Sequence, residues 1–252
     1  MNVDLRLTDA VATVRLDRPE AGNALNDALK TDLLAVLQKV ADDPGVRAVI
    51  LTGAGSTFTV GQDLRELKAH PETADGTVER HYNPITLLLA TMPKPVVAAV
   101  NGTCVGAGLG FALACDLHVW SSRATLSTAF HKVGLTCDSG LSSTLARSVG
   151  LARAASLIHL AEPFSIQQAI TWGFAGEVVE PLEVEPVAAK LARRLAAGPT
   201  RAFAASKRLL ARPLAEALEA EALEQNALAA THDHTAAVAA FLAREEPVFR
   251  GR

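Results

Sequence analysis

The 252-residue sequence contains no long apolar run and no long basic run. None of its apolar stretches approaches the roughly 20 residues of a membrane-spanning helix, and its first residues lack the basic and apolar segments of a secretory signal. We therefore expect a cytoplasmic protein with no membrane partner. The net charge is -3, and lysines and arginines occur singly or in pairs, which excludes the basic patch of a nucleic-acid-binding protein.

The sequence also lacks the spacings that bind metals or form disulfide frameworks. Its three cysteines, Cys104, Cys115 and Cys137, lie in apolar or glycine-rich contexts, which predicts reduced thiols with structural roles. The adjacent polar residues 232–234 (His-Asp-His) have no second spaced pair and would give poor tetrahedral geometry. We expect these three residues on a solvated helix face, and we expect no metal site.

The N-terminal part of the chain alternates strands and helices. Residues 3–16 show an apolar alternation of period two around a turn at residues 8–10, which predicts a hairpin. Leucines at helical spacing predict a helix over residues 25–40, which the breakers at residues 43–45 end. Residues 46–52 then form a nearly continuous apolar run, typical of a strand covered on both faces.

The same order recurs farther along the chain. We predict a helix over residues 78–91, a strand over 96–101, a short helix over 109–114 and a strand over 117–121. The segment 69–84 before the strand is polar and punctuated by glycine and proline, which indicates a mobile loop that shapes the pocket. Strands that alternate with helices favour an α/β fold with largely parallel sheets.

From Ser139 onward the pattern is mainly helical. Ser165 and Gln168 have the spacing of a capping box, residues 178–179 predict one last strand, and a helix is expected over residues 187–197. Several leucines farther on supply more apolar surface than a small appendage can bury, so we expect them to pack on the core or on another subunit. They are Leu209, Leu210, Leu214, Leu218, Leu223 and Leu228.

Two glycine-rich turns stand where a predicted strand gives way to a helix. They are FTVGQDL at residues 58–64 and NGTCVGAGLG at residues 101–110. Backbone N–H groups at such places point out of the turn and can stabilise an oxyanion, although tight packing alone also explains a glycine-rich turn. The second turn lacks the GxGxxG placement of a dinucleotide site and the Gly-Lys-Ser/Thr of a P-loop.

In order and spacing, these turns and several further segments resemble the crotonase (enoyl-CoA hydratase/isomerase) superfamily. The further segments are HYNP at residues 81–84, PKPV at 93–96, AFHKVGL at 129–135 and DSG at 138–140. Within the superfamily, GQDL and CDSG look most like the ring-1,2-epoxyphenylacetyl-CoA isomerases of the phenylacetate pathway. The resemblance implies an α/β spiral of ββα units over residues 1–195 and a C-terminal helical region over 196–252 used in oligomerisation, in a homotrimer or a dimer of trimers.

The resemblance also implies an acyl-CoA thioester as partner, with coenzyme A as part of the substrate and no separate cofactor. The backbone N–H groups of Gln62 and Ala107 would form an oxyanion hole around the thioester carbonyl. Many relatives carry glycine at the position of Ala107, but the N–H is the functional group there. The implied substrate-binding residues are Thr59, Val60, Asp63, Leu64, Gly108 and Phe130.

The sequence departs from the hydratases of this family at the two positions where they carry glutamates. Gly110 and Phe130 stand there, so the groups that would activate water and protonate the α-carbon are missing. Asp138 remains, at a position where related isomerases carry a catalytic aspartate. Asp138 could also cap the helix expected near Ser139, because aspartate is a favoured N-cap residue.

Three functions stay open on the sequence. The first is an isomerase in which Asp138 moves a proton, on a Δ3/Δ2-enoyl-CoA or a ring epoxide. The second is a dehalogenase or thioesterase in which Asp138 is a nucleophile and His81 or His131 a base. The third is a paralogue that binds coenzyme A without catalysis. A hydratase with non-standard residues is a further alternative to the first.

Other polar residues have less specific contexts. His81 lies in a segment that lines the acyl pocket in relatives, whereas His131 is expected to be packed or exposed. Arg201, Lys207 and Arg208 could contact the phosphates of coenzyme A, but arginines and lysines of such helices usually face solvent.

Overall fold

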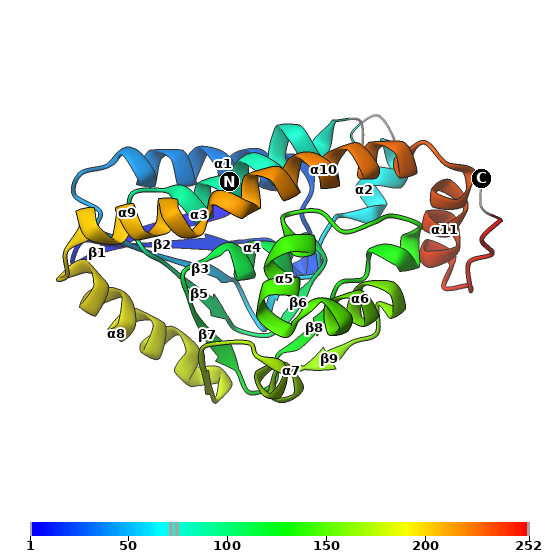
Figure 1. Cartoon of the computed structure of the whole chain (residues 1–252). Helices are drawn as coiled ribbons and strands as arrows, with labels where there is room; N and C mark the ends of the chain where they lie inside the picture. The colour runs from blue at the N-terminus through cyan, green and yellow to red at the C-terminus, as the bar shows by residue number, and fades with distance from the viewer. Residues whose placement is uncertain (1, 71–72, 74–75, 251–252) are drawn as a thin grey trace.

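The structure is a computed structural model, and it describes residues 2–70, 73 and 76–250. A six-stranded sheet forms the centre of the fold in the order β1-β2-β3-β5-β7-β10 (Figure 1). β1 and β2 form an antiparallel hairpin, and the pairs from β2 to β10 are parallel. The six strands are β1 Val3–Thr8, β2 Val11–Leu16, β3 Ala48–Gly53, β5 Val96–Val100, β7 Leu117–Ser121 and β10 Glu177–Val179.

A second, smaller sheet has the order β4-β6-β8-β9. Its strands β4 (Thr57–Thr59), β6 (Thr103–Val105) and β8 (Thr125–Ser127) each follow a strand of the large sheet, and β9 (Phe164–Ser165) pairs antiparallel with β8. Each repeat therefore places one strand in each sheet before it turns into a helix. β4 and β6 overlap the two segments that the sequence indicated only as glycine-rich turns, and β8 and β9 were not predicted.

Helices enclose both sheets. α8 (Val184–Ala196) covers one face of the large sheet with a stripe of small side chains, while α1 (Asp27–Asp42), α3 (Asn83–Thr91) and α4 (Ala107–Ala114) pack against the other face. The remaining helices of the core are α2 (Leu64–Ala69), α5 (Leu141–Val149), α6 (Leu151–Leu160) and α7 (Ile166–Trp172). None of the helices described in the chain is long and apolar enough to cross a membrane.

The predicted elements are confirmed with shifted ends. The helix expected from residue 187 begins at Val184, so Pro186 lies in its first turn, where backbone N–H groups have no partner within the helix. The capping box of Ser165 and Gln168 is present. The helix predicted over 78–91 is confirmed as a helical turn at Val78–Tyr82 that continues into α3, so the overlapping prediction of a loop over 69–84 is wrong from residue 78 onward. Residues 71, 72, 74 and 75 of that segment lie outside the described part.

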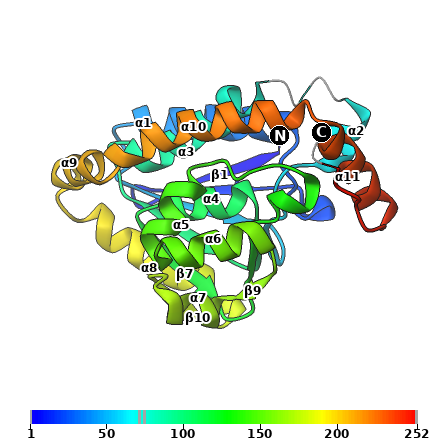
Figure 2. The same ribbon diagram turned by 45° about the vertical axis from the view of Figure 1, so that its right-hand side comes forward.

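The C-terminal helices fold back over the core. α9 (Thr200–Leu210) and α10 (Arg212–Ala229) run along α3, and α11 (His232–Ala243) lies beside α2, as both ribbon views show (Figures 1 and 2). The leucines divide between two environments: Leu214 and Leu218 are buried within the chain, whereas Leu209, Leu210 and Leu223 are each more than 60% exposed.

Lys207 corrects the expectation of outward basic side chains on α9. It is buried, and its Nζ donates to Asp116 Oδ2 at 2.7 Å and to the carbonyl oxygens of Leu89 and Lys94 at 2.9 Å. Arg201 and Arg208 are exposed as expected. Since a buried ammonium needs such partners, Lys207 fixes α9 to the core.

Candidate active site

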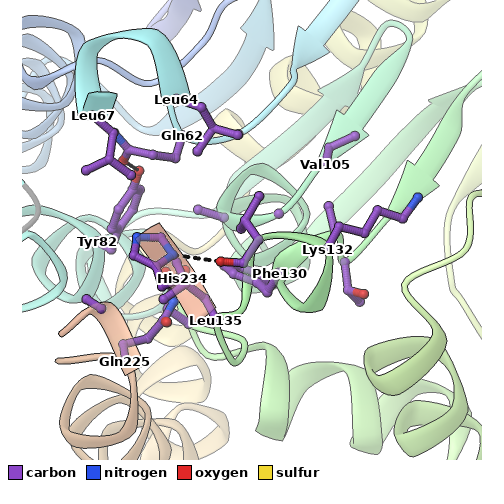
Figure 3. A pocket seen from close by; sticks show the side chains of 18 of the residues that line it. Gln62, Leu64, Leu67, Tyr82, Val105, Phe130, Lys132, Leu135, Gln225 and His234 are labelled. Carbon is purple, nitrogen blue, oxygen red and sulfur yellow. Dashed lines mark hydrogen bonds between the residues drawn. The ribbon is translucent and has the colours of Figure 1, made fainter. Parts of the chain in front are cut away.

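A cavity of about 350 Å³ opens between the two glycine turns and the C-terminal helices, a size typical of small-molecule sites (Figure 3). Its walls come from α2, the turn before α3, the start of α4, a 3-10 turn at Phe130–Val133, α10 and α11. Most of the lining is apolar. Among the described residues that line it, Asp138 carries the only carboxyl group.

The first glycine turn presents the amide of Gln62 at the cavity wall. Leu25 N donates to Gly61 O at 2.8 Å, and Asp63 N donates to Leu25 O at 3.3 Å, so both neighbours of Gln62 are held by the same residue. Gly61 has a φ of +85°, a conformation that glycine adopts without a steric penalty. The N–H of Gln62 itself has no acceptor among the described residues.

The second glycine turn presents the amide of Ala107. Gly106 has φ 57° and ψ -129°, and Ala107 is the first residue of α4, where an N–H has no partner within the helix. Its N–H also has no acceptor in the described part of the chain. A methyl group on Gly61 would lie 3.1 Å from the carbonyl oxygen of Val105, so the two turns are in contact. Two unpaired amides on adjoining turns can bind an oxyanion.

Asp138 lies in the same cavity and is 3% exposed. Its Oδ1 accepts from Ser139 Oγ at 2.7 Å, and its Oδ2 accepts from Gln225 Nε2 at 2.9 Å. Burial raises the pKa of Asp138 to about 6, although these two hydrogen bonds and the charge of Lys30 act in the opposite direction. This carboxyl group can therefore exchange a proton near neutral pH.

The alternative that Asp138 caps α5 is wrong, because another carboxylate does so from α10. Glu221 accepts from Gly140 N and Ser142 N, both at 2.7 Å, and satisfies amides at the start of α5. Glu221 is buried, and burial together with the charge of Asp138 raises its pKa to about 7. Asp138 is thereby free to face the cavity.

Sequence reasoning missed both Glu221 and Gln225. A signal was available: with Leu214 and Leu218 they occupy the buried stripe of α10 at spacings of four, three and four residues. Polar residues at apolar positions of an amphipathic helix need buried partners. Here the partners are the turn that carries Asp138 and the carboxyl group of Asp138 itself.

Gly110 and Phe130 occupy the positions where hydratases are expected to carry glutamates. A Cβ atom on Gly110 would lie 2.4 Å from Ser139 Cβ and 2.6 Å from the Ser139 carbonyl oxygen, so no side chain fits there without a shift of this turn. Phe130 lines the cavity and is 9% exposed. Neither position offers an acid or a base.

The predicted substrate-binding residues divide into two groups. Val60, Leu64 and Phe130 line the cavity. Asp63 does not: its Oδ1 accepts from the amides of Arg65 and Glu66 and caps α2, and its Oδ2 lies 3.1 Å from Arg18 Nη1. Gly108 and Thr59 pack against each other beside the cavity, since a Cβ on Gly108 would lie 2.1 Å from Thr59 Cγ2.

Tyr82, from the segment 81–84 that lines the acyl pocket in relatives, lines the cavity, but sequence reasoning gave it no specific role. Its hydroxyl donates to Gln62 Oε1, and Lys30 Nζ lies 5.2 Å from the centre of its ring. Burial raises the pKa of Tyr82 well above its usual value, so the hydroxyl stays protonated. Tyr82 thereby holds the side chain of Gln62, whose amide forms part of the first turn.

Two histidines differ from expectation, and His131 agrees with it. His81 does not line the cavity; its Nε2 lies 3.2 Å from Thr31 Oγ1. His131 lies outside the cavity, with Nδ1 3.3 Å from the His159 carbonyl oxygen. His234 was expected on a solvated face, but it is buried, and its Nδ1 lies 2.7 Å from the carbonyl oxygen of Val133. His234 lines the cavity (Figure 3).

The cysteines agree with the prediction of free structural thiols: Cys104, Cys115 and Cys137 are free and buried. Burial raises the pKa of Cys137 to about 12 and raises the pKa values of the other two as well. They are therefore protonated near neutral pH.

The chain is similar to known acyl-CoA enzymes over nearly its whole length. A family model described as enoyl-CoA hydratase/isomerase matches residues 6–252. The 1,2-epoxyphenylacetyl-CoA isomerase of Escherichia coli is 37% identical over 250 residues, covering 96% of this chain and 95% of the relative. The 4-chlorobenzoyl coenzyme A dehalogenase-1 of an Arthrobacter species is 34% identical over 242 residues, covering 93% and 88%.

Solved structures agree with these relatives. The crystal structure of an enoyl-CoA hydratase from Mycobacterium avium subsp. paratuberculosis superimposes with a TM-score of 0.88 at 32% identity, covering 99% of both chains. The structure combines two mixed sheets, C-terminal helices and two amide-bearing turns beside a cavity. These features and the relatives define its class as a crotonase-fold enzyme for acyl-CoA thioesters. The chain belongs to the enoyl-CoA hydratase/isomerase family.

Proposed function

We propose that this protein is an acyl-CoA isomerase that moves a proton through a thioester enolate, with Asp138 as its single acid and base. One observation carries the proposal: Asp138 is the only carboxyl group among the described residues of a cavity whose wall also presents the amides of Gln62 and Ala107. One base beside one oxyanion site is sufficient for a 1,3-proton shift.

The thioester carbonyl oxygen would lie between the amides of Gln62 and Ala107. Asp138, ionised, removes a proton from the carbon beside the carbonyl group, and the electron pair moves onto the carbonyl oxygen. The two amides stabilise this oxygen as it gains charge. The protonated Asp138 then returns the proton at the far end of the dienolate, and the double bond moves by one position.

The environment of Asp138 suits both halves of this cycle. A pKa of about 6 leaves the carboxylate mostly ionised at pH 7, yet its buried site makes the protonated form easier to reach than in water. Hydration would need a second group to orient water, and Gly110 and Phe130 supply none. These features favour isomerisation over hydration.

The binding residues proposed for the acyl-CoA follow the cavity wall. Val60, Leu64 and Phe130 would contact the acyl group and the pantetheine arm, because all three line the cavity. Asp63 and Gly108 would act indirectly. Asp63 caps α2, and Gly108 lets α4 approach Thr59. The Escherichia coli relative makes a ring epoxide of a phenylacetyl thioester one candidate substrate, beside a linear 3-enoyl thioester.

We also propose that residues 196–252 take part in assembly, as a homotrimer or a dimer of trimers. The exposed side chains of Leu209, Leu210 and Leu223 support this proposal. A mass measurement by light scattering would test it: a monomeric mass at micromolar concentration would contradict it.

Hydrolysis is a second candidate, and His234 is the observation that favours it. Its Nδ1 is 2.7 Å from a carbonyl oxygen, which leaves Nε2 unprotonated in the neutral ring, and His234 lines the cavity with Asp138. Asp138 would then attack the thioester carbonyl carbon and displace the coenzyme A thiolate, and water activated by His234 would add to the Asp138 carbonyl carbon of the resulting anhydride and release the acid. Single turnover in oxygen-18 water separates the two candidates, because only hydrolysis incorporates the label into Asp138.

The main test is a product analysis by mass spectrometry with linear 3-enoyl-CoA and 1,2-epoxyphenylacetyl-CoA. We expect products of unchanged mass, and we expect the Asp138→Asn variant to lose this activity while Asp42→Asn, at an exposed position of α1, retains it. A major product heavier by one water molecule would contradict the proposal.

A further inference from the structure

Gln225 joins the C-terminal region to the proposed base. It lies on α10, 87 residues after Asp138 in the sequence, and its Nε2 donates to Asp138 Oδ2 at 2.9 Å. The side chain is 4% exposed. The other end of the amide differs, because Oε1 has no hydrogen-bond partner among the described residues. A buried acceptor without a partner is costly, so this free oxygen requires an explanation.

The proposed role of Asp138 as a proton carrier explains the unpaired Oε1 atom of Gln225. An ionised carboxylate only accepts hydrogen bonds, whereas the protonated acid also donates one. A lysine or arginine beside Asp138 would satisfy the ionised form alone. An amide can satisfy both forms, because a half turn about its last torsion exchanges Nε2 for Oε1. Since no described group holds Oε1 of Gln225, this rotation breaks only the hydrogen bond from Nε2 to Asp138, which the protonated acid replaces with its own.

The other ionisable groups near Asp138 are committed elsewhere. Lys30 Nζ donates to Thr77 Oγ1 at 2.7 Å, and the Tyr82 hydroxyl donates to Gln62. Both carboxylate oxygens of Glu221 accept backbone amides. Cys137, the neighbour of Asp138 in the sequence, is buried and protonated. Among the described residues, the direct hydrogen bonds to the Asp138 carboxyl group therefore come from Ser139 Oγ and Gln225 Nε2.

We propose that Gln225 is a positioning residue that follows the protonation state of Asp138, donating from Nε2 to the carboxylate and accepting at Oε1 from the acid. The proposal deepens the proposed function and rests on it, because it assigns Asp138 a proton midway through turnover. In this arrangement α10 does more than cover the cavity, since it keeps the carboxyl group in one orientation through both steps.

The test compares Gln225→Met and Gln225→Lys with the wild-type protein. Methionine keeps the size of the side chain but removes both amide atoms, so the pKa of Asp138 should rise by about one pH unit. This rise alone lowers the ionised fraction at pH 7 about twofold, so we expect a total loss of turnover of about tenfold, with the remainder due to lost positioning of the carboxyl group. Lysine offers donors only, so the pKa should fall while turnover still drops, because the acid form has no acceptor. Glu224→Gln, at an exposed position of the same helix, is the control and should change neither.

The direct readout is a pH titration of Asp138 by NMR on protein labelled with carbon-13 at the aspartate carboxyl carbons, with Asp138→Asn to assign the signal. Opposite pKa changes in the two variants support the proposal; equal pKa values in all proteins would overturn it. Should Gln225→Met fail to fold, the side-chain amide of Gln225 can be followed in the wild-type protein with nitrogen-15 glutamine. Its signal must titrate with Asp138 and must not titrate in Asp138→Asn.

The two proposals can fail separately. If Asp138→Asn keeps its isomerase activity, the proposed function is wrong, and the titration still reports whether Gln225 responds to Asp138. If activity is lost in Asp138→Asn but the pKa of Asp138 ignores Gln225, the isomerase proposal stands and the role of Gln225 is refuted.

Discussion

The two walls of the cavity are built in different ways. One wall presents the amides of Gln62 and Ala107, which are backbone groups set by glycine turns at the ends of short strands. The other wall presents Asp138, a side chain that depends on Glu221 and Gln225 from α10, more than 80 residues later in the chain. Backbone geometry fixes the first wall, and long-range side-chain contacts fix the second.

This difference predicts how each wall responds to substitution. Most side-chain substitutions leave the backbone N–H in place. We therefore expect the wall with the Gln62 and Ala107 amides, the amide wall, to keep its activity under such substitutions and to lose it only when an N–H is removed. The carboxylate wall should respond to changes at several distant positions. The carboxylate wall is also less stable, because a carboxylate is buried there without a cation in direct contact.

Removal of one amide should give the largest effect. Ala107→Pro deletes the N–H at the first residue of α4, a position where proline fits a helix. We expect turnover to fall by about 10²- to 10³-fold, the usual loss for one oxyanion donor, with little change in the unfolding temperature. Steady-state kinetics and thermal unfolding measure the two quantities.

The matched control is His232→Pro, at the first residue of α11 after the extended residue Thr231. It should keep most of the activity. Equal losses in both variants would mean that proline disturbs the fold rather than the oxyanion site.

The stability of the carboxylate wall should depend on pH through Asp138. Its pKa is raised from 3.8 to about 6 in the folded protein, so folding favours the protonated form, and stability is lost as the pH rises through 6. Asp138→Asn removes this penalty and should unfold with a free energy about 3 kcal/mol higher than the wild type at pH 8.

The same variant should show almost no gain at pH 4, where Asp138 is protonated in the folded protein. Urea unfolding at the two pH values tests this expectation. A gain of equal size at pH 4 and pH 8 would show that Asp138 carries no buried negative charge.

A smaller effect is expected where the two walls meet. Gly110 belongs to α4, whose first residue supplies an amide, and its Cα faces Ser139, which follows Asp138. Gly110→Ala should lower the free energy of unfolding by about 2 kcal/mol, because the added methyl group overlaps Ser139. Denaturant unfolding measures the loss, and Gly45→Ala, which has no backbone neighbour at this distance, is the control.

Gly110→Glu should behave as a more damaging version of the same change and should not create a hydratase. A gain of hydration activity in Gly110→Glu would show that the turn at Ser139 can move to admit a second carboxylate.

Much of the fold could be predicted because its signals are local. The hairpin of β1 and β2, the buried strands β3 and β5, and the capping box before α7 each follow from a few neighbouring residues. The small sheet could not be predicted, because strands such as Thr103–Val105 are too short to show a period and exist only through pairing with distant strands.

The candidate site shows the same difference between residues with local sequence signals and residues that depend on distant partners. Gln62, Ala107 and Asp138 lie in motifs, and the structure places all three at one cavity. Glu221 and Gln225 were missed and His234 was misplaced: the spacing on α10 could have shown that the first two face inward, but their partners near Asp138 lie more than 80 residues away in the sequence. Lys207 was misjudged for the same reason: its partner Asp116 is 91 residues away.

The central claim is that Asp138 alone carries the proton, and solvent exchange tests it most directly. With a 3-enoyl-CoA in deuterium oxide, repeated reversible turnover by the wild-type protein should introduce deuterium into the acyl chain, as read by NMR, because the protonated Asp138 exchanges with solvent in a fraction of the turnovers before it returns the proton. In Asp138→Asn this rate should fall by about 10²- to 10⁴-fold, while binding of the thioester, followed by calorimetry, stays within a few-fold of the wild type. Exchange by Asp138→Asn at the wild-type rate would contradict the account.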